Sequence, residues 1–140
     1  MSEKVETIKK WLIKADEDLG TAIITHNHIT EYHFTNAFHC QQAVEKYLKG
    51  YLIFLDIEFR RIHDLVYLLE LINQKYQIDD KMIDRITELE DYAVEIRYPE
   101  ISIDLTDEEI VNAINIAKEI RFFVTSKMNI QVDYNDVLNE

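Results

Sequence analysis

The scarcity of glycine and proline limits, more than any other feature, the folds that this sequence can adopt. Its 140 residues include only two glycines and one proline, Pro99. Sandwiches and barrels need many tight turns, and tight turns depend on these two residue types. Long helices joined by a few loops need neither, so the sequence predicts an all-α protein.

Hydrophobic spacing predicts about five helices. Apolar residues recur every three or four positions, the period of one face of an α-helix, in five segments. These segments cover residues 3–25, 31–55, 64–76, 80–97 and 107–127. Asp64 is a natural N-cap, and Thr106 with Glu109 has the spacing of a capping box. Short connections favour an up-and-down helical bundle.

The bundle should occupy most of the chain as one domain. We expect it to span residues 1–127, because the apolar periodicity stops near Lys127. Residues 128–140 are then expected to form a mobile C-terminal tail.

Charge and cysteine content exclude several classes of function. The formal net charge of −12 opposes binding to the phosphate backbone of DNA. The single cysteine, Cys40, cannot form an internal disulfide, which favours a cytoplasmic compartment. The longest strongly apolar stretch, residues 51–55, is far shorter than the roughly 20 residues of a membrane-spanning helix. The N-terminus lacks the apolar run of a signal peptide. We therefore expect neither DNA nor a membrane as a partner.

The helix expected over residues 31–55 carries polar side chains where core residues should lie. Its apolar stripe consists of Phe34, Ala37, Phe38, Val44, Leu48, Leu52 and Leu55. Gln41 and Glu45 fall inside this stripe, and Gln42 and Lys49 lie beside it. A buried carboxylate costs several kcal/mol unless a cation pairs with it. The sequence therefore predicts that Glu45 binds Arg97 or, failing that, Arg121.

Two interpretations of this polar patch stay open. The first is a structural ion pair inside the bundle, and the second is a ligand pocket, since buried ionisable groups occur in both. Metal binding is not expected, because the five histidines lack the spacing of a ligand set on one helix face. No phosphate-binding glycine loop or nucleophile elbow is present either, and we expect no cofactor. Cys40 lies among aromatic and alanine core positions, so we interpret it as inert packing.

Three separated motifs carry a family resemblance. Residues 38–49 read FHCQQAVEKYLK, residues 63–65 read HDL, and residues 97–99 read RYP. In this order they resemble the second helix, the following segment and the end of the fourth helix of the HEPN domain. The resemblance covers roughly residues 8–125.

The resemblance implies a five-helix bundle that often forms a dimer. HEPN proteins frequently accompany a small nucleotidyltransferase as its paired subunit and are implicated in nucleotide binding. Several branches are ribonucleases or toxins of toxin–antitoxin pairs, and these use an arginine, a spacer of several residues and then a histidine. In this sequence no histidine follows Arg97 or Arg121. Arg60 and Arg61 come closest to a histidine, His63, but with only two residues or one between.

We therefore expect a non-catalytic HEPN subunit that binds a nucleotide, pairs with a nucleotidyltransferase, or does both, in a module of the toxin–antitoxin type. The residues expected to bind the ligand or partner are Gln41, Gln42, Glu45, Lys49, Arg97 and Tyr98. One alternative is a ribonuclease toxin with an irregular active site at Arg60, Arg61 and His63. Another is a helical interaction scaffold without a ligand.

A homodimer is also expected. One end of the second helix carries a broad apolar surface, which should need a cover. This surface consists of Tyr47, Tyr51, Ile53, Phe54 and Leu55.

Overall fold

Five helices build the protein, as the sequence predicts. The computed structural model describes residues 2–97, 105–132 and 138, and for residues 93–97 it describes only the backbone. The helices are α1 (Glu3–His28), α2 (His33–Phe54), α3 (Leu65–Asn73), α4 (Asp80–Arg97) and α5 (Asp107–Met128). The part of the chain so described contains no strand. None of the described helices is both long and apolar enough to cross a lipid bilayer.

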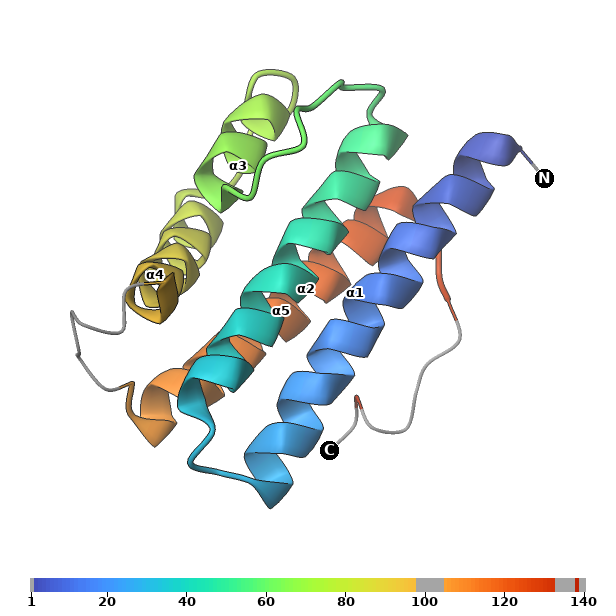
Figure 1. Ribbon diagram of the computed structural model, residues 1–140. Coiled ribbons are helices and arrows are strands. Elements are labelled where there is room, and N and C mark those ends of the chain that lie inside the picture. The colour runs from blue at the N-terminus through green and yellow to red at the C-terminus, as the bar shows by residue number, and fades with distance from the viewer. Residues whose placement is uncertain (1, 98–104, 133–137, 139–140) are drawn as a thin grey trace.

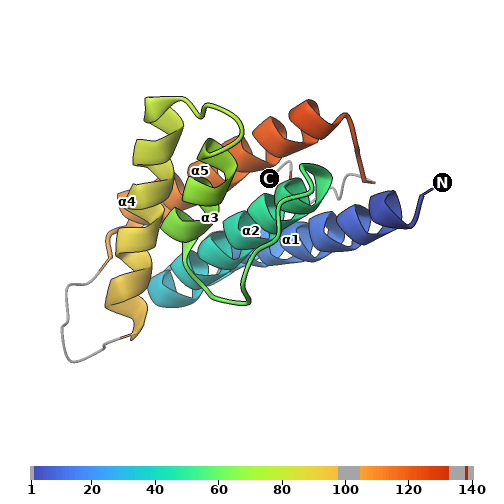
Figure 2. The same ribbon diagram turned by 90° about the horizontal axis from the view of Figure 1, so that it is seen from above.

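Helix α2 lies in the middle of the bundle. Figure 1 shows α1 antiparallel to α2 on one side and the shorter α3 and α4 on the other side, with α5 behind. Figure 2, seen from above, shows the same arrangement, with α5 crossing behind α2. Because α2 contacts all four other helices, most of its surface is buried.

Side-chain caps define the start of three helices. The predicted N-cap Asp64 is confirmed, since its carboxylate accepts from the backbone N–H of Tyr67 at 3.1 Å. The predicted capping box is confirmed as well, with Thr106 and Glu109 each binding the other's backbone N–H. Ser2 caps α1 with a single bond, since its hydroxyl oxygen accepts from the backbone N–H of Val5. Such caps satisfy N–H groups that the first helical turn leaves without partners.

Two helix ends differ from the sequence prediction by three residues. Helix α1 continues to His28, because residues 26–28 contain no glycine or proline to stop it and Ile29 still donates its backbone N–H to Thr25 at 2.7 Å. Helix α3 ends at Asn73, three residues earlier than predicted. The Asn73 side chain accepts from the backbone N–H of Ile78 at 3.0 Å, so it holds the turn that follows.

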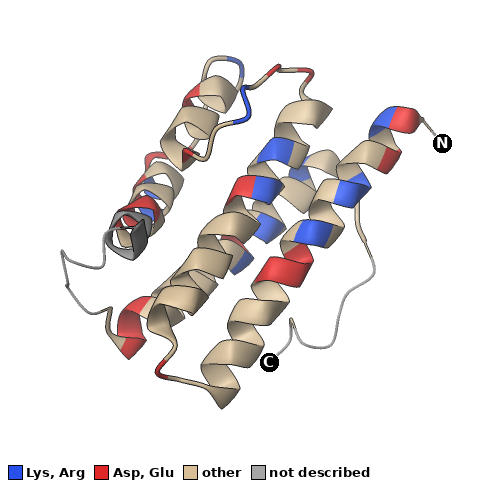
Figure 3. Cartoon of the chain, in the orientation of Figure 1, with Lys and Arg blue, Asp and Glu red and all other residues tan. Residues whose placement is uncertain are grey.

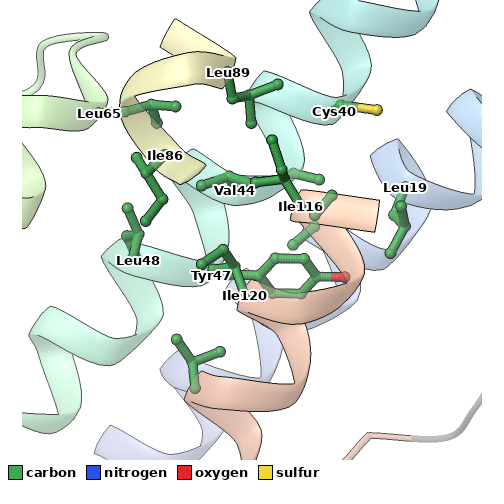
Figure 4. Packing of buried hydrophobic residues seen from close by; sticks show 14 of the residues in the cluster. Leu19, Cys40, Val44, Tyr47, Leu48, Leu65, Ile86, Leu89, Ile116 and Ile120 are labelled. Carbon is green, nitrogen blue, oxygen red and sulfur yellow. The ribbon is translucent and has the colours of Figure 1, made fainter. Parts of the chain in front are cut away.

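The buried face of α2 is rotated relative to the predicted stripe. Phe34 and Phe38 are 39% and 42% exposed, so their prediction as core residues is wrong. Ala37, which belongs to the predicted stripe, is buried, and so are Cys40 and Ala43, which lie outside it. Figure 4 shows the middle of this core, where α2 meets the other helices. The labelled side chains are Leu19, Cys40, Val44, Tyr47, Leu48, Leu65, Ile86, Leu89, Ile116 and Ile120. Burial raises the pKa of the Cys40 thiol above its ordinary value, which agrees with an inert core residue.

The apolar end of α2 is covered within the chain itself. Tyr51 and Leu55 are buried, and Ile53 and Phe54 pack against the core. The Tyr51 ring meets the ring of Phe123 on α5 edge to face, with centroids 5.7 Å apart. The homodimer stays a prediction, but this surface no longer supports it.

Part of the C-terminal segment packs against the bundle. Ile130 and Val132 lie against the core, and Leu138 is buried. Residues 133–137 and 139–140 are outside the described part of the chain, so the mobile tail also stays a prediction.

Candidate functional site

A pocket of about 550 Å³ lies where α1 and α2 meet the loop between α2 and α3. Its lining combines aromatic and cationic side chains from all three segments. The lining residues are Trp11, Lys49, Ile53, Phe59, Arg61 and His63.

A buried carboxylate organises the polar side of this pocket. Glu45 is only 3% exposed at its side chain, and both of its oxygens lie 3.0–3.1 Å from Nδ1 of His63. It also accepts a bond of 3.2 Å from Nζ of Lys49, one helical turn further along α2. The Lys49 side chain is 7% exposed, whereas that of His63 is 66% exposed. Glu45 therefore holds one buried cation and one accessible imidazole.

Two aromatic rings complete the surroundings of the Lys49 ammonium group. Its Nζ atom lies 5.7 Å from the Trp11 ring centroid and 5.9 Å from that of Phe59. The two rings meet edge to face at 6.5 Å. Both distances from Nζ to a ring centroid lie within the roughly 6 Å over which a ring attracts a cation. Lys49 is thus fixed in place with little water around it.

Local features of the sequence place these groups. Gly50 lies where α2 packs on α1, since a Cβ atom there would touch Cβ of Trp11 at 3.4 Å, an ordinary van der Waals contact. In the loop, the backbone N–H of Arg60 donates to the Tyr67 hydroxyl at 3.0 Å. The Asp64 cap then fixes the start of α3. These contacts carry Arg61 and His63 over the face of α2 that bears Glu45.

The structure brings together residues from both predicted sets. Glu45 and Lys49 come from the expected ligand site, and Arg61 and His63 come from the alternative ribonuclease cluster. The third member of that cluster, Arg60, is exposed and does not line the pocket.

The other predicted site residues lie elsewhere. Gln41 is buried one turn before Glu45, as predicted, and its Nε2 atom has no hydrogen-bond partner. Gln42 is half-buried and is not a lining residue. The side chain of Arg97 and the whole of Tyr98 lie outside the described residues.

Only one of the two predicted partners of Glu45 can be placed. The Arg97 side chain lies outside the described residues, so that pairing stays a prediction. Arg121, the second candidate, binds Asp16 through bonds of 2.8 and 3.1 Å. Asp16 also accepts from the Tyr47 hydroxyl at 2.5 Å, so this network joins α1, α2 and α5. Burial and the Asp16 carboxylate raise the pKa of Tyr47 well above its usual range. The i, i+4 spacing of Glu45 and Lys49 was the signal in the sequence for the partner that the structure shows.

Sequence reasoning also missed two contributors to the pocket. Trp11 and Phe59 were not proposed as site residues, and Phe59 lies in a loop where no periodicity marks it. Asp18, which was not predicted either, lies outside the pocket lining on the seam between α1 and α2, where it binds His39 at 2.9 Å and also Lys46. Within the described residues, no group of three or more metal-ligating side chains is close enough to hold a metal ion.

Comparison with known proteins assigns the family. The family model described as HEPN domain matches residues 8–137. Among solved structures, an archaeal HEPN homologue, ST0689, is 25% identical with a TM-score of 0.70, over 86% of this chain and 97% of that chain. TT1696 from Thermus thermophilus has a similar fold, at 23% identity and a TM-score of 0.74 with the same coverage. No curated protein matches the sequence significantly.

Proposed function

The chain belongs to the HEPN domain family, and on that premise we propose that it is a non-catalytic subunit that binds a nucleotide in the pocket beside Lys49. The observation that carries this proposal is a fixed ammonium group held between a carboxylate and two aromatic rings. A nucleotide offers the matching chemistry, because it has both an anionic and a flat aromatic part.

The cationic side of the pocket suits a phosphate. Lys49, Arg61 and His63 line the same cavity, and Arg61 and His63 belong to its exposed rim. Charge-assisted hydrogen bonds from such groups are among the stronger polar contacts in proteins. Glu45 does not face the ligand alone, since the Lys49 ammonium group pairs with it and the His63 ring hydrogen-bonds to it. A local cationic site can therefore exist on a chain of net charge −12.

The aromatic side suits a base. Trp11 and Phe59 line the pocket, and base stacking on such rings is worth about 1–3 kcal/mol. The cavity volume of about 550 Å³ also falls within the usual range for small-molecule sites. The proposal also includes pairing with a small nucleotidyltransferase, a toxin–antitoxin role and a homodimer. These three parts are supported only by membership of the HEPN family.

The single tryptophan of the chain provides a direct test, because Trp11 lines the pocket. We expect ATP, ADP and AMP to change Trp11 fluorescence in a saturable way, and inorganic phosphate and adenosine to bind more weakly. Arg61→Ala should weaken nucleotide binding roughly tenfold, the loss of about one charge-assisted hydrogen bond.

Arg60→Ala is the matched control, because Arg60 is the adjacent exposed arginine outside the pocket lining. It should bind like the wild type. Equal loss in both variants would indicate general attraction to positive charge, and no saturable signal with any nucleotide would refute the proposed pocket.

A ribonuclease is the second candidate, favoured by the contact between Glu45 and His63. A carboxylate that holds one imidazole nitrogen can keep the ring oriented as a general base, and His63 is accessible. The spacing of the catalytic HEPN branches is missing, so we expect no RNA cleavage by the purified chain. Cleavage that both His63→Ala and Arg61→Ala abolish would place the ribonuclease first.

A further inference from the structure

Lysine and arginine are scarce in the segments that form one end of the bundle, although Lys118 on α5 lines a pocket with His26 and Asn27 there. No lysine or arginine occurs between Lys14 and Lys46, nor between Arg97 and Lys118. Figure 3 accordingly shows no blue ribbon where α1 ends and where α2 and α5 begin. The pocket described above lies toward the other end of α2, since Lys49 is 11 residues, or roughly 16 Å of helix, beyond Phe38.

Several carboxylates lie at this end of the bundle. The first turn of α5 consists of three consecutive carboxylates, at positions 107–109, and Glu31 lies in the turn between α1 and α2. His26 binds Asp107 with its Nε2 atom 2.9 Å from the carboxylate oxygen, so the end of α1 and the start of α5 are adjacent.

The same end exposes large apolar side chains. They belong to the turn between α1 and α2 and to the first turns of α2, and we call them the α2 entry surface. The surface consists of Ile29, Tyr32, Phe34 and Phe38. Tyr32 is 52% exposed, more than either phenylalanine. Grouped exposed aromatic residues with a charged rim are typical of protein interfaces.

We propose that the α2 entry surface is the docking site of a protein partner that presents an apolar patch surrounded by lysine and arginine. Charge decides the kind of partner. A second copy joined through the same surface would bring two sets of carboxylates together, and like charges across an interface oppose association. Nucleic acid is disfavoured at this end for the same reason. A basic partner instead gains from both the carboxylates and the aromatic residues.

This proposal does not depend on the nucleotide pocket, because it uses different residues at the opposite end of α2. Either one can therefore fail without the other. The two together describe a subunit that docks a partner at one end and keeps its pocket open toward the other.

A synthetic amphipathic helix of leucine and lysine, labelled with fluorescein, is a suitable probe of this chemistry. Fluorescence anisotropy should show saturable binding that weakens as salt is added, and hydrogen exchange should slow at residues 29–38. The double variant Phe34→Ala/Phe38→Ala should bind at least about tenfold more weakly, because interface aromatics carry much of the binding energy. Glu31→Lys should slow association and reduce the salt dependence. All three positions are exposed, so these variants should fold.

Matched controls separate this surface from general stickiness. Tyr76→Ala and Phe122→Ala remove exposed aromatic rings elsewhere and should bind the peptide like the wild type. A leucine–glutamate helix, and a lysine–serine helix without an apolar face, should not bind. Equal binding by all variants, equal binding of the lysine–serine helix, or no binding would overturn the proposal. Self-association in sedimentation runs that Phe34→Ala/Phe38→Ala abolishes would instead assign the surface to a second copy of the chain.

Discussion

Replacing Glu45 by alanine tests the buried ionic centre of the pocket. The variant leaves the ammonium group of Lys49 at a position where its side chain is only 7% exposed. Removing one partner of a buried ion pair typically costs about 3–5 kcal/mol, mainly because the other charge stays buried.

Two features of the structure reduce this cost. The Lys49 ammonium group keeps its contacts with the Trp11 and Phe59 rings. A cation–π contact of this kind is worth about 0.5–2 kcal/mol. The second partner, His63, is 66% exposed and can be solvated when Glu45 is gone, so its loss adds little. We therefore expect Glu45→Ala to lower the free energy of unfolding by about 2–3 kcal/mol.

Urea denaturation followed by circular dichroism provides the measurement, with an unchanged m-value showing that only stability has changed. A double-mutant cycle of Glu45→Gln and Lys49→Met tests the reasoning further, because the double variant leaves no buried charge. The double variant should be more stable than the summed losses of Glu45→Gln and Lys49→Met predict. A loss below about 0.5 kcal/mol for Glu45→Ala, the level of an ordinary surface change, would refute the buried pair.

Four further predictions concern the helix packing and the buried titratable groups. Gly50→Ala should leave the stability in thermal unfolding unchanged or raise it by up to about 1 kcal/mol, since alanine favours the helix. Its Cβ atom would only touch Trp11 at 3.4 Å. Gly50→Leu should destabilise the protein and shift Trp11 fluorescence. Tyr47→Phe should cost about 1–2 kcal/mol in urea denaturation, because it removes the hydrogen bond to Asp16. Burial raises the pKa of Cys40 and of Tyr47 in the folded protein, so the unfolded chain loses these two protons at lower pH. The free energy of unfolding should therefore fall as the pH rises above their ordinary pKa values of about 8.5 and 10. Tyr47→Phe should show a smaller fall. The Cys40 thiol should react with a thiol reagent only after unfolding, and fast reaction of the native protein would contradict its burial.

The helices and most of their ends could be predicted from the order of the amino acids. Helical periodicity is a property of neighbouring residues, and caps act within one turn, so Asp64 and Thr106 could be assigned without tertiary contacts. The burial of Gln41 and Glu45 could be predicted for the same reason, because both fall within one apolar stripe. The family motifs were equally visible in the sequence, and the family model confirms them.

The rotation of the helices and the contacts between their side chains follow from tertiary packing. The wheel of α2 has apolar residues on several sides, and packing against its neighbours buried Ala43, outside the predicted stripe, while it exposed Phe34 and Phe38. Periodicity gives directions within one helix but not the rotation of that helix in the bundle.

The partner of Glu45 shows the same limit. His63 reaches it from a loop, and the path of a loop follows from hydrogen bonds and packing rather than from any repeat in the sequence. Arg121 was a reasonable cation for Glu45 by sequence, yet Asp16 on α1 lay within its reach once the helices had packed. A charged side chain selects its partner by distance in three dimensions, and that distance exists only in the folded protein.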